Sequence, residues 1–291
     1  MTVWANDYFK DRFGHKMYKA SISLNVTCPN RDGRVGIGGC SFCSAMGSGE
    51  FASCALESVT KQIDSAINLV AHKVPQNTGY IAYFQSFTST YCDAGFLKKA
   101  VDEAMNHPKV EAVAIGTRPD CLGEEILNVL DAANRRMPVF IELGLQTRDD
   151  NVARSFNRCY ETSVYESAVK ALKAIGINVI THVIFGLPGE SEEMMLDTVR
   201  FVKNCGTDGI KFTSLYILKN TAYEKLYEEG KIEVLSQDEY FDIVQKALNI
   251  IGDELVVHRV TGDGPKSLLI APMWTANKRA VVNYINSRFK R

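Results

Sequence analysis

The sequence contains no long apolar run and no segment of low complexity. No window approaches the roughly 20 consecutive apolar residues that a membrane-spanning helix requires. The first ten residues include Asn6, Asp7 and Lys10, where a signal peptide would need an unbroken apolar stretch. No stretch is dominated by Gly, Pro or Ser, so the composition does not indicate disorder. We therefore expect a cytoplasmic protein that does not bind membranes and that folds along its whole length.

The chain as a whole also lacks an excess of charge of one sign. Its formal net charge is −1, from 33 basic and 34 acidic residues. The segment 259–291 departs from this balance, with seven basic residues against one acid, Asp263. A basic segment of this kind can bind a polyanion, although a solvent-exposed basic helix face has the same composition. Charge alone leaves both interpretations open.

The 291 residues are 46% hydrophobic, enough to bury the core of one α/β barrel. Short β-rich runs alternate with helical periodicity, which implies parallel strands joined by right-handed crossovers. Six strands are expected at 21–26, 80–84, 112–116, 139–143, 178–185 and 209–216, and helices at 56–72, 94–106, 123–136, 163–175 and 192–204. An open doubly wound sheet and an incomplete (β/α)₆ barrel both fit this order.

The regular alternation of strands and helices ends after residue 216. Helices are expected at 223–229 and 238–251, a strand at 255–260 and a terminal helix at 274–289. We therefore predict two parts: residues 1–220 form a partial barrel with an N-terminal lead-in, and residues 221–291 form an α/β extension packed on it.

Three of the eight cysteines lie in one loop directly after the first expected strand. Cys28 is followed by eleven residues, then Cys40, then two residues and Cys43. The two-residue gap lets both thiolates face one metal centre, and glycines within the loop let the backbone curl around a bulky group. Iron–sulfur clusters normally take four thiolates, so three leave one iron open for a ligand.

A zinc site is the alternative, with Cys54 or His15 as the fourth ligand. The loop's place at the carboxyl end of a barrel strand favours the cluster, because βα barrels carry their chemistry at that end. The remaining cysteines are expected to be small buried residues, although Cys92 and Cys121 follow strand ends and can line the mouth of the barrel.

The loop Cys28-Pro-Asn-Arg-Asp-Gly, followed by Gly-Gly-Cys40-Ser-Phe-Cys43, resembles the radical S-adenosylmethionine (SAM) superfamily. Within it, the loop is typical of the YhcC/YtqA-type subgroup, which is related to the Elongator catalytic subunit and the coproporphyrinogen dehydrogenases. The resemblance covers nearly the whole chain. It implies an incomplete TIM-type barrel, a [4Fe-4S] cluster, and SAM cleaved to a 5′-deoxyadenosyl radical that abstracts hydrogen. A one-electron reductant such as flavodoxin or ferredoxin is implied as a partner.

The same resemblance assigns residues to the nucleoside part of the cofactor. Phe42, inside the Cys-x-Phe-Cys element, is expected to border the adenine, together with Ile184 and Leu187 at the end of the fifth strand. Glu142 and Gln146 are expected to bind the ribose. If the family resemblance is set aside, the alternative for Glu142 is a carboxylate inside the barrel whose hydrogen bonds are all made by other protein groups.

The methionine part of the cofactor has its own expected contacts. Gln85, Ser86 and Thr88 stand where most members of the superfamily carry a Gly-Gly-Glu motif for the amino group. Arg158, twelve residues beyond Gln146, resembles the arginine that pairs with the carboxylate, for which a guanidinium is a two-pronged partner. A surface salt bridge is the alternative for Arg158.

The resemblance further implies tRNA as the substrate, with conversion of 5-carboxymethylaminomethyluridine to 5-aminomethyluridine at the wobble position. Basic and aromatic residues in the last 34 positions support contact with RNA. These substrate candidates are His258, Arg259, Asp263, Trp274, Lys278 and Arg279.

Each substrate candidate has a simpler alternative, with Trp274 as a core anchor and His258 as a packed histidine. For the whole chain, a small-molecule or protein substrate and a zinc-stabilised, non-catalytic RNA-binding module stay open. A methylthiolating enzyme is disfavoured because the sequence has no second cysteine triplet.

Overall fold

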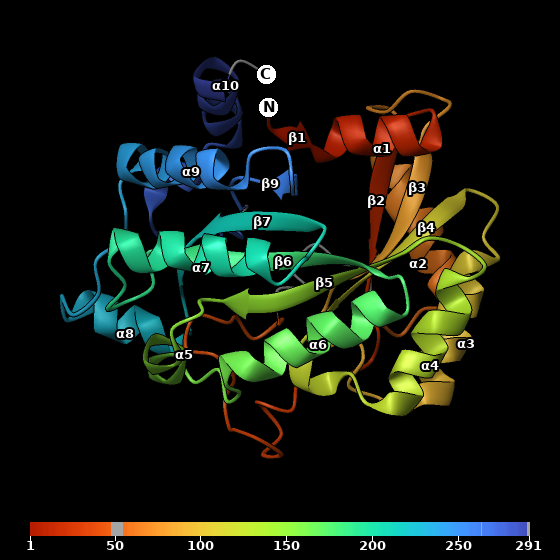
Figure 1. Cartoon of the computed structure of the whole chain (residues 1–291), viewed down its shortest axis with the longest axis horizontal. Coiled ribbons are helices and arrows are strands. Elements are labelled where there is room, and N and C mark those ends of the chain that lie inside the picture. The colour runs from red at the N-terminus through yellow and green to blue at the C-terminus, as the bar shows by residue number, and fades with distance from the viewer. Residues whose placement is uncertain (48–54, 263, 290–291) are drawn as a thin grey trace.

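The structure is a computed structural model that describes residues 1–47, 55–262 and 264–289. Within these residues, eight strands form one parallel sheet in the order β1-β9-β7-β6-β5-β4-β3-β2. The strands are β1 Val3–Trp4, β2 Met17–Ile22, β3 Gly79–Phe84, β4 Val110–Thr117, β5 Val139–Gln146, β6 Asn178–Phe185, β7 Gly209–Ser214 and β9 Val256–Arg259. The sheet curls into a half-barrel with helices outside it (Figure 1). The fold is therefore the expected incomplete TIM-type barrel.

The helices that connect the strands cover the outer face of the sheet with their apolar sides. They are α2 Val59–Val70, α3 Ala94–Met105, α4 Glu124–Asn134, α6 Thr162–Ala174 and α7 Glu192–Asn204, with a short α5 Asp150–Ser155 before α6. Four begin with a side-chain cap, from Ser58, Asp93, Asp149 and Ser191, each accepting a backbone N–H of the first turn. On the apolar sides of α3 and α4, Leu97 and Leu130 are fully buried against the sheet.

The first barrel strand lies earlier than the sequence predicted, at 17–22 instead of 21–26. Beyond Ile22 the backbone leaves the sheet, because the N–H and carbonyl of Ser23 bond to the side chain of Gln62 on α2. Residues 23–26 therefore begin the cysteine loop. A helix that the sequence analysis did not predict, α1 Ala5–Phe13, packs Phe9 edge-on against Phe140 at 5.5 Å.

The C-terminal segment both extends the sheet and caps it. Strand β9 pairs in parallel with β7 and β1, so it belongs to the barrel sheet. Helix α9 Gln237–Ile251 packs beside α7. A second, two-stranded antiparallel sheet joins β8 Ile217–Leu218 to β10 Leu269–Ala271, near α8 Ala222–Glu228, and α10 Lys278–Phe289 ends the described chain. A division at residue 220 stays a prediction. Among the described residues, no helix is long and apolar enough to cross a membrane.

Candidate active site at the carboxyl ends of the strands

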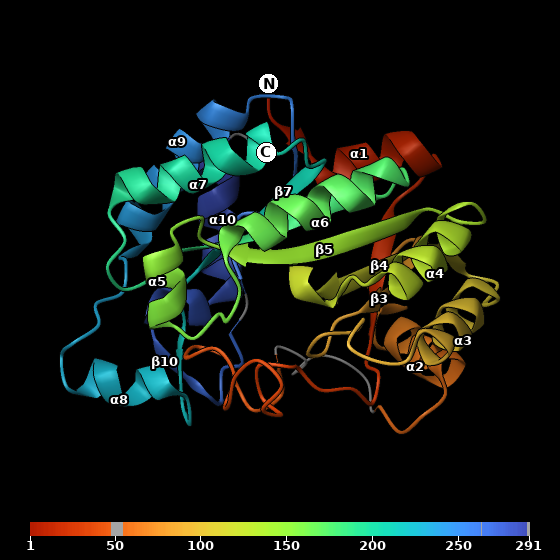
Figure 2. The same ribbon diagram turned by 60° about the horizontal axis from the view of Figure 1, so that its bottom comes forward.

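The cysteine loop lies at the carboxyl end of β2, on the same side of the sheet as α8 and β10 (Figure 2). Cys28, Cys40 and Cys43 all line a cavity of about 1590 Å³ that extends into the half-barrel. Short backbone bonds shape the loop, among them those from the Arg31 N–H to the Cys28 carbonyl and from the Cys43 N–H to the Cys40 carbonyl, both 2.8 Å. This volume exceeds that of a typical pocket for one small ligand. It has room for a cofactor and part of a substrate.

The turn 156–158 holds the cysteine loop in place. The Ser41 N–H donates to the Phe156 carbonyl at 2.9 Å, and Asn157 Nδ2 donates to the Gly39 carbonyl at 2.9 Å. The ring of Phe42 packs on Phe156 with 5.3 Å between centroids. Because these contacts tie the loop to the segment after β5, the thiols are held in position by the barrel itself.

The thiols of the loop are close enough to influence one another. Burial, followed by the charges of Cys43 and Cys28, raises the pKa of Cys40 to about 12. Three thiols gathered in a partly buried loop fit a cation that takes thiolate ligands, since a bound metal removes their protons and relieves the mutual repulsion. Gly38 and Gly39 adopt φ of +81° and +87°, as expected for a loop that curls tightly.

The zinc alternative places its fourth ligand elsewhere. His15 precedes β2 and its Nε2 lies 3.2 Å from Glu111 Oε2, whereas the cysteine loop follows the other end of that strand. Six residues of parallel strand, about 20 Å, separate the two positions. Cys54 lies outside the described residues. Within the described part of the chain, no three His, Cys, Asp or Glu side chains have the spacing of a single-ion site.

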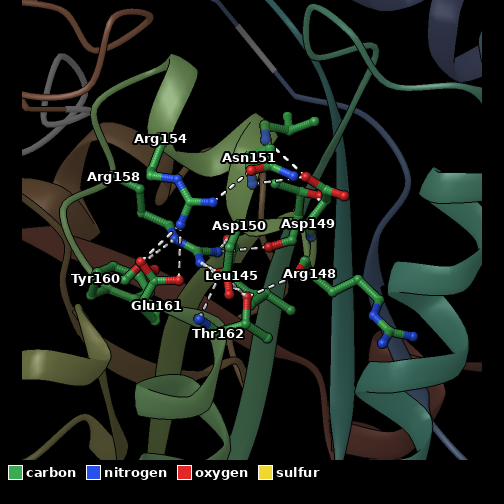
Figure 3. A network of polar contacts seen from close by, with 12 residues as sticks. Leu145, Arg148, Asp149, Asp150, Asn151, Arg154, Arg158, Tyr160, Glu161 and Thr162 are labelled. Atoms are coloured by element: carbon green, nitrogen blue, oxygen red, sulfur yellow. Dashed lines mark hydrogen bonds and ion pairs between the residues drawn. The ribbon is translucent and has the colours of Figure 1, made fainter.

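Arg158, expected to pair with the methionine carboxylate, is the centre of a buried network (Figure 3). Its side chain is 1% exposed. All five guanidinium N–H groups donate to described residues: to the carbonyls of Leu145, Thr147 and Tyr160, to Asp150 Oδ1 and to Thr162 Oγ1, at 2.7–3.0 Å. A guanidinium has five donors, so this network uses all of them. In this structure Arg158 ties the end of β5 to the start of α6.

Arg118 is a second buried cation, which the sequence analysis did not identify. It follows β4, lines the cavity and is 9% exposed. Its Nε and Nη2 donate to the two carboxylate oxygens of Asp120 at 2.9 and 2.7 Å, and its guanidinium lies over the Tyr160 ring. Its charge opposes the rise in the pKa of Cys40. Arg118 is therefore a cavity-lining cation beside the thiols, marked in the sequence by Arg-Pro-Asp at a strand end.

Glu142 lies inside the barrel and accepts hydrogen bonds from four side chains. Oε1 accepts from Lys19, and Oε2 accepts from Lys211, from His182 at 2.9 Å and from the hydroxyl of Tyr83 at 2.5 Å. Burial alone would raise the pKa of Glu142, but the charges of Lys19 and Lys211 and the His182 bond hold it well below its usual value. The carboxylate is thus kept ionised inside the protein.

The other expected cofactor contacts divide into cavity-lining and buried residues. Those that line the cavity are Phe42, Gln85, Thr88, Gln146 and Ile184. Ser86 is buried, and its Oγ accepts from Ser23 Oγ at 2.6 Å. Leu187 is buried in an apolar cluster that also includes Phe42 and Ile184. The cavity-lining set is the one that a cofactor can touch.

The expected substrate residues are also separated by the fold. His258 and Arg259 lie in β9, within the strand expected at 255–260, and both line the cavity. Lys278 lies at the cavity where α10 begins, and Arg279 is exposed beside it. Asp263 lies outside the described residues. Cys92 and Cys121 are half-buried and do not contribute to the described cavity lining.

Trp274 is packed inside the C-terminal segment. Its ring centroid lies 5.5 Å from that of Tyr240 and 5.7 Å from that of Phe241. Its Nε1 donates to the Leu235 carbonyl at 3.1 Å. These contacts are those of a core anchor, the simpler of the two alternatives.

Comparison with known proteins identifies the family. The model of the radical SAM superfamily matches residues 24–202, and that of the radical SAM C-terminal domain matches residues 207–291. The chain belongs to the radical SAM superfamily. It is 40% identical to the protein YtqA of Bacillus subtilis, over 98% of this chain and 88% of YtqA. It is 32% identical to YhcC of Escherichia coli K12, over 92% and 85%. These relatives place this radical SAM enzyme in the YhcC/YtqA-type subgroup.

Solved structures share the fold. Elp3 of the archaeon Methanocaldococcus infernus, with its N-terminus deleted, matches with a TM-score of 0.69 at 15% identity, over 94% of this chain and 64% of Elp3. The chain therefore spans less than two thirds of that protein. Coproporphyrinogen III oxidase of Escherichia coli matches with a TM-score of 0.52 at 16% identity, over 79% and 52%. Membership of this family supports an enzyme and not a zinc-stabilised binding module, and it implies a [4Fe-4S] cluster and SAM.

Proposed function

We propose that this radical SAM enzyme modifies tRNA, converting 5-carboxymethylaminomethyluridine at the wobble position to 5-aminomethyluridine. One observation carries the substrate assignment. Over 68% of its length the chain is 27% identical to a protein of Dehalococcoides mccartyi named tRNA uridine(34) acetyltransferase, of which it covers 43%. Position 34 is the wobble position, and the proposed change also acts on the side chain of a uridine there.

The cavity supports a substrate larger than the cofactor alone. Its 1590 Å³ extend from the three thiols to Lys19 and Lys211 inside the barrel. Lys266 and Lys278 also line it, in the basic segment that the sequence singled out. A positively charged approach to a deep pocket suits a nucleotide that is turned out of an RNA loop, because the phosphates meet cations while the base enters the pocket.

The cavity-lining residues suggest how the cofactors would be held. Cys28, Cys40 and Cys43 would ligate three irons and leave the fourth for the methionine end of SAM. Phe42 and Ile184 would border the adenine. When bound, the cluster and SAM supply hydrogen-atom abstraction from an unreactive carbon–hydrogen bond. The barrel residues orient the two ligands and exclude water.

Arg118 is the better candidate for the carboxylate of the cofactor. Arg158 already donates all five of its N–H groups. Both arginines line the cavity, but the hydrogen bonds of Arg118 to Asp120 use only Nε and Nη2. A guanidinium that is already oriented by Asp120 can bind an anion with little loss of side-chain entropy.

The function is tested by anaerobic reconstitution of the cluster and incubation with SAM, dithionite and tRNA that carries 5-carboxymethylaminomethyluridine. Digested nucleosides are then measured by mass spectrometry. We expect this nucleoside to decrease and 5-aminomethyluridine to appear, and a Cys43→Ala variant to produce neither change. If 5′-deoxyadenosine forms at the same rate with and without tRNA and no nucleoside changes, tRNA is not the substrate.

A further inference from the structure

The interior of the half-barrel has more hydrogen-bond donors than acceptors around Glu142. Lys19 on β2 and Lys211 on β7 come from strands on either side of β5, and both reach the same carboxylate. Each ammonium group has three N–H donors, and each makes one hydrogen bond, to Glu142, among the described residues. Four N–H donors in the described cluster therefore remain for another acceptor.

The acceptor already present is shared by four donors. Lys19 donates to Glu142 Oε1, and Lys211, His182 and Tyr83 donate to Oε2, so the carboxylate has little capacity for the remaining ammonium N–H groups. Two ammonium groups on one carboxylate also leave a net positive charge. Lys211 is 7% exposed, so water solvates this excess poorly.

Further positive groups surround the same place. Burial and the charge of Lys19 lower the pKa of Lys211 well below its usual value despite the attraction of Glu142, and Arg259 acts in the same direction. Burial and the two lysines likewise lower the pKa of His258. The local potential therefore disfavours added protons and favours an anion.

The cluster also has access to the reaction space. Lys19, Lys211, Glu142, His182 and Tyr83 line the same cavity as the three cysteines. Both ammonium groups lie over the Tyr83 ring, at 4.3 and 5.1 Å from its centroid, which fixes their direction on that wall. An anion that enters the cavity from the thiol side can meet both.

We propose that Lys19 and Lys211 together bind a carboxylate of the substrate, with Glu142 holding the two ammonium groups in place. Resting on the proposed function, this carboxylate is that of the carboxymethyl group on the amino nitrogen, which the product no longer carries. The lysine pair would then distinguish the substrate, which carries the anion, from the product, which carries a primary ammonium group that the lysines repel.

The test compares two synthetic anticodon stem-loops that differ only at the wobble uridine, one with 5-carboxymethylaminomethyl and one with 5-aminomethyl. Their affinities are measured with reconstituted, SAM-bound wild-type protein, Lys19→Gln and Lys211→Gln. Lys19→Gln is the primary variant, because the Lys19 side chain is 26% exposed and the change is tolerated more easily than at Lys211. Lys173→Gln is the matched control, since it breaks an ion pair to Asp208 that does not line the cavity.

We expect Lys19→Gln to weaken binding of the carboxymethylaminomethyl stem-loop by about tenfold or more, the typical effect of removing a charge-assisted hydrogen bond. The aminomethyl stem-loop should bind as before or more tightly, and Lys173→Gln should change neither affinity. Equal weakening of both stem-loops would mean that the lysine holds a backbone phosphate, and this overturns the proposal, as does no weakening of either.

A second readout separates this inference from the assignment of tRNA. If wild type binds neither stem-loop, the proposed function has failed, and the lysine pair is tested with acetate alone. Acetate should raise the thermal midpoint of the wild type above that in chloride at equal ionic strength, because a ligand of the native state stabilises it. The rise should be absent in Lys19→Gln. Equal midpoints in the two salts for the wild type would overturn the anion site itself.

Discussion

Replacing Arg158 separates a cofactor contact from a structural one. The resemblance to the family assigns this side chain to the methionine carboxylate, whereas the structure shows five donors bonded inside the protein (Figure 3). Arg158→Ala would leave the buried carbonyls of Leu145 and Thr147 without these donors. It would also remove the partner of Asp150 at 2.8 Å.

The expected magnitude follows from burial. Breaking a buried ion pair by removing one partner costs about 3–5 kcal/mol, and each buried acceptor left unsatisfied adds to it. For a protein of this size, that corresponds to a fall in the thermal midpoint on the order of 10 °C. Arg158→Lys should recover only part of the stability, because an ammonium group has three donors and no planar fork.

Arg154→Ala, in the short helix α5 just before the turn that contains Arg158, is the matched control. Its guanidinium bonds Glu161 and Asn151, but its side chain is 58% exposed. A pair of this kind contributes about 0–1 kcal/mol, so the thermal midpoint should hardly move.

The assay measures the thermal midpoint and the calorimetric affinity for SAM on the same reconstituted samples. We expect Arg158→Ala to lose stability, while the protein that stays folded binds SAM with nearly the wild-type affinity. A variant with the wild-type midpoint and a strongly reduced affinity would show that the resemblance is right and that the network does not carry the stability assigned to it.

Four further outcomes are expected. Replacing the three loop cysteines together with Ala should abolish the visible absorption of the cluster, and an unchanged spectrum would place the cluster elsewhere. Arg118→Ala should weaken SAM binding about 10- to 100-fold by calorimetry, and wild-type affinity would remove it from the site. Replacing Lys278 and Arg279 with neutral residues should flatten the salt dependence of tRNA binding, by roughly one unit of log–log slope for each phosphate contact that is lost. The control Arg288→Gln, which breaks an ion pair with Asp242, should leave this slope unchanged. Burial raises the pKa of Glu190 to about 7, so its contribution favours folding at low pH and is lost as the pH rises through 7. Urea denaturation should show that Glu190→Gln removes about 3 kcal/mol of pH dependence between pH 5 and 8.

The fold could be predicted because the apolar pattern is regular along the barrel. Strand β6 and the helix after it, α7, have the bounds predicted at 178–185 and 192–204. The predicted boundary of the first barrel strand was wrong because a side chain takes the place of the neighbouring strand there. The backbone of Ser23 bonds to the Gln62 side chain. Strand β9 could be predicted as a strand, but not as a member of the barrel sheet, because its pairing with β7 joins residues far apart in the sequence.

The site was only partly predictable, for a different reason. The cysteine loop can be recognised from the spacing of its three cysteines. Lys19 and Lys211, in contrast, are single lysines within apolar strands, and nothing in the sequence connects them. Their shared partner, Glu142, lies 123 and 69 residues away from them. Arg118 follows a strand end beside an acid, a sign that can be read from sequence but that is common on protein surfaces.

The position of Arg158 gives a structural role to a residue that the family resemblance assigns to the cofactor. The Phe156–Asn157–Arg158 turn acts through its neighbours: Phe156 and Asn157 hold the cysteine loop, and Arg158 holds the turn to β5 and α6. Because unfolded protein binds no SAM, a lower apparent affinity in an unstable Arg158 variant would not by itself distinguish a structural role from a cofactor contact. Stability and affinity must therefore be measured on the same samples.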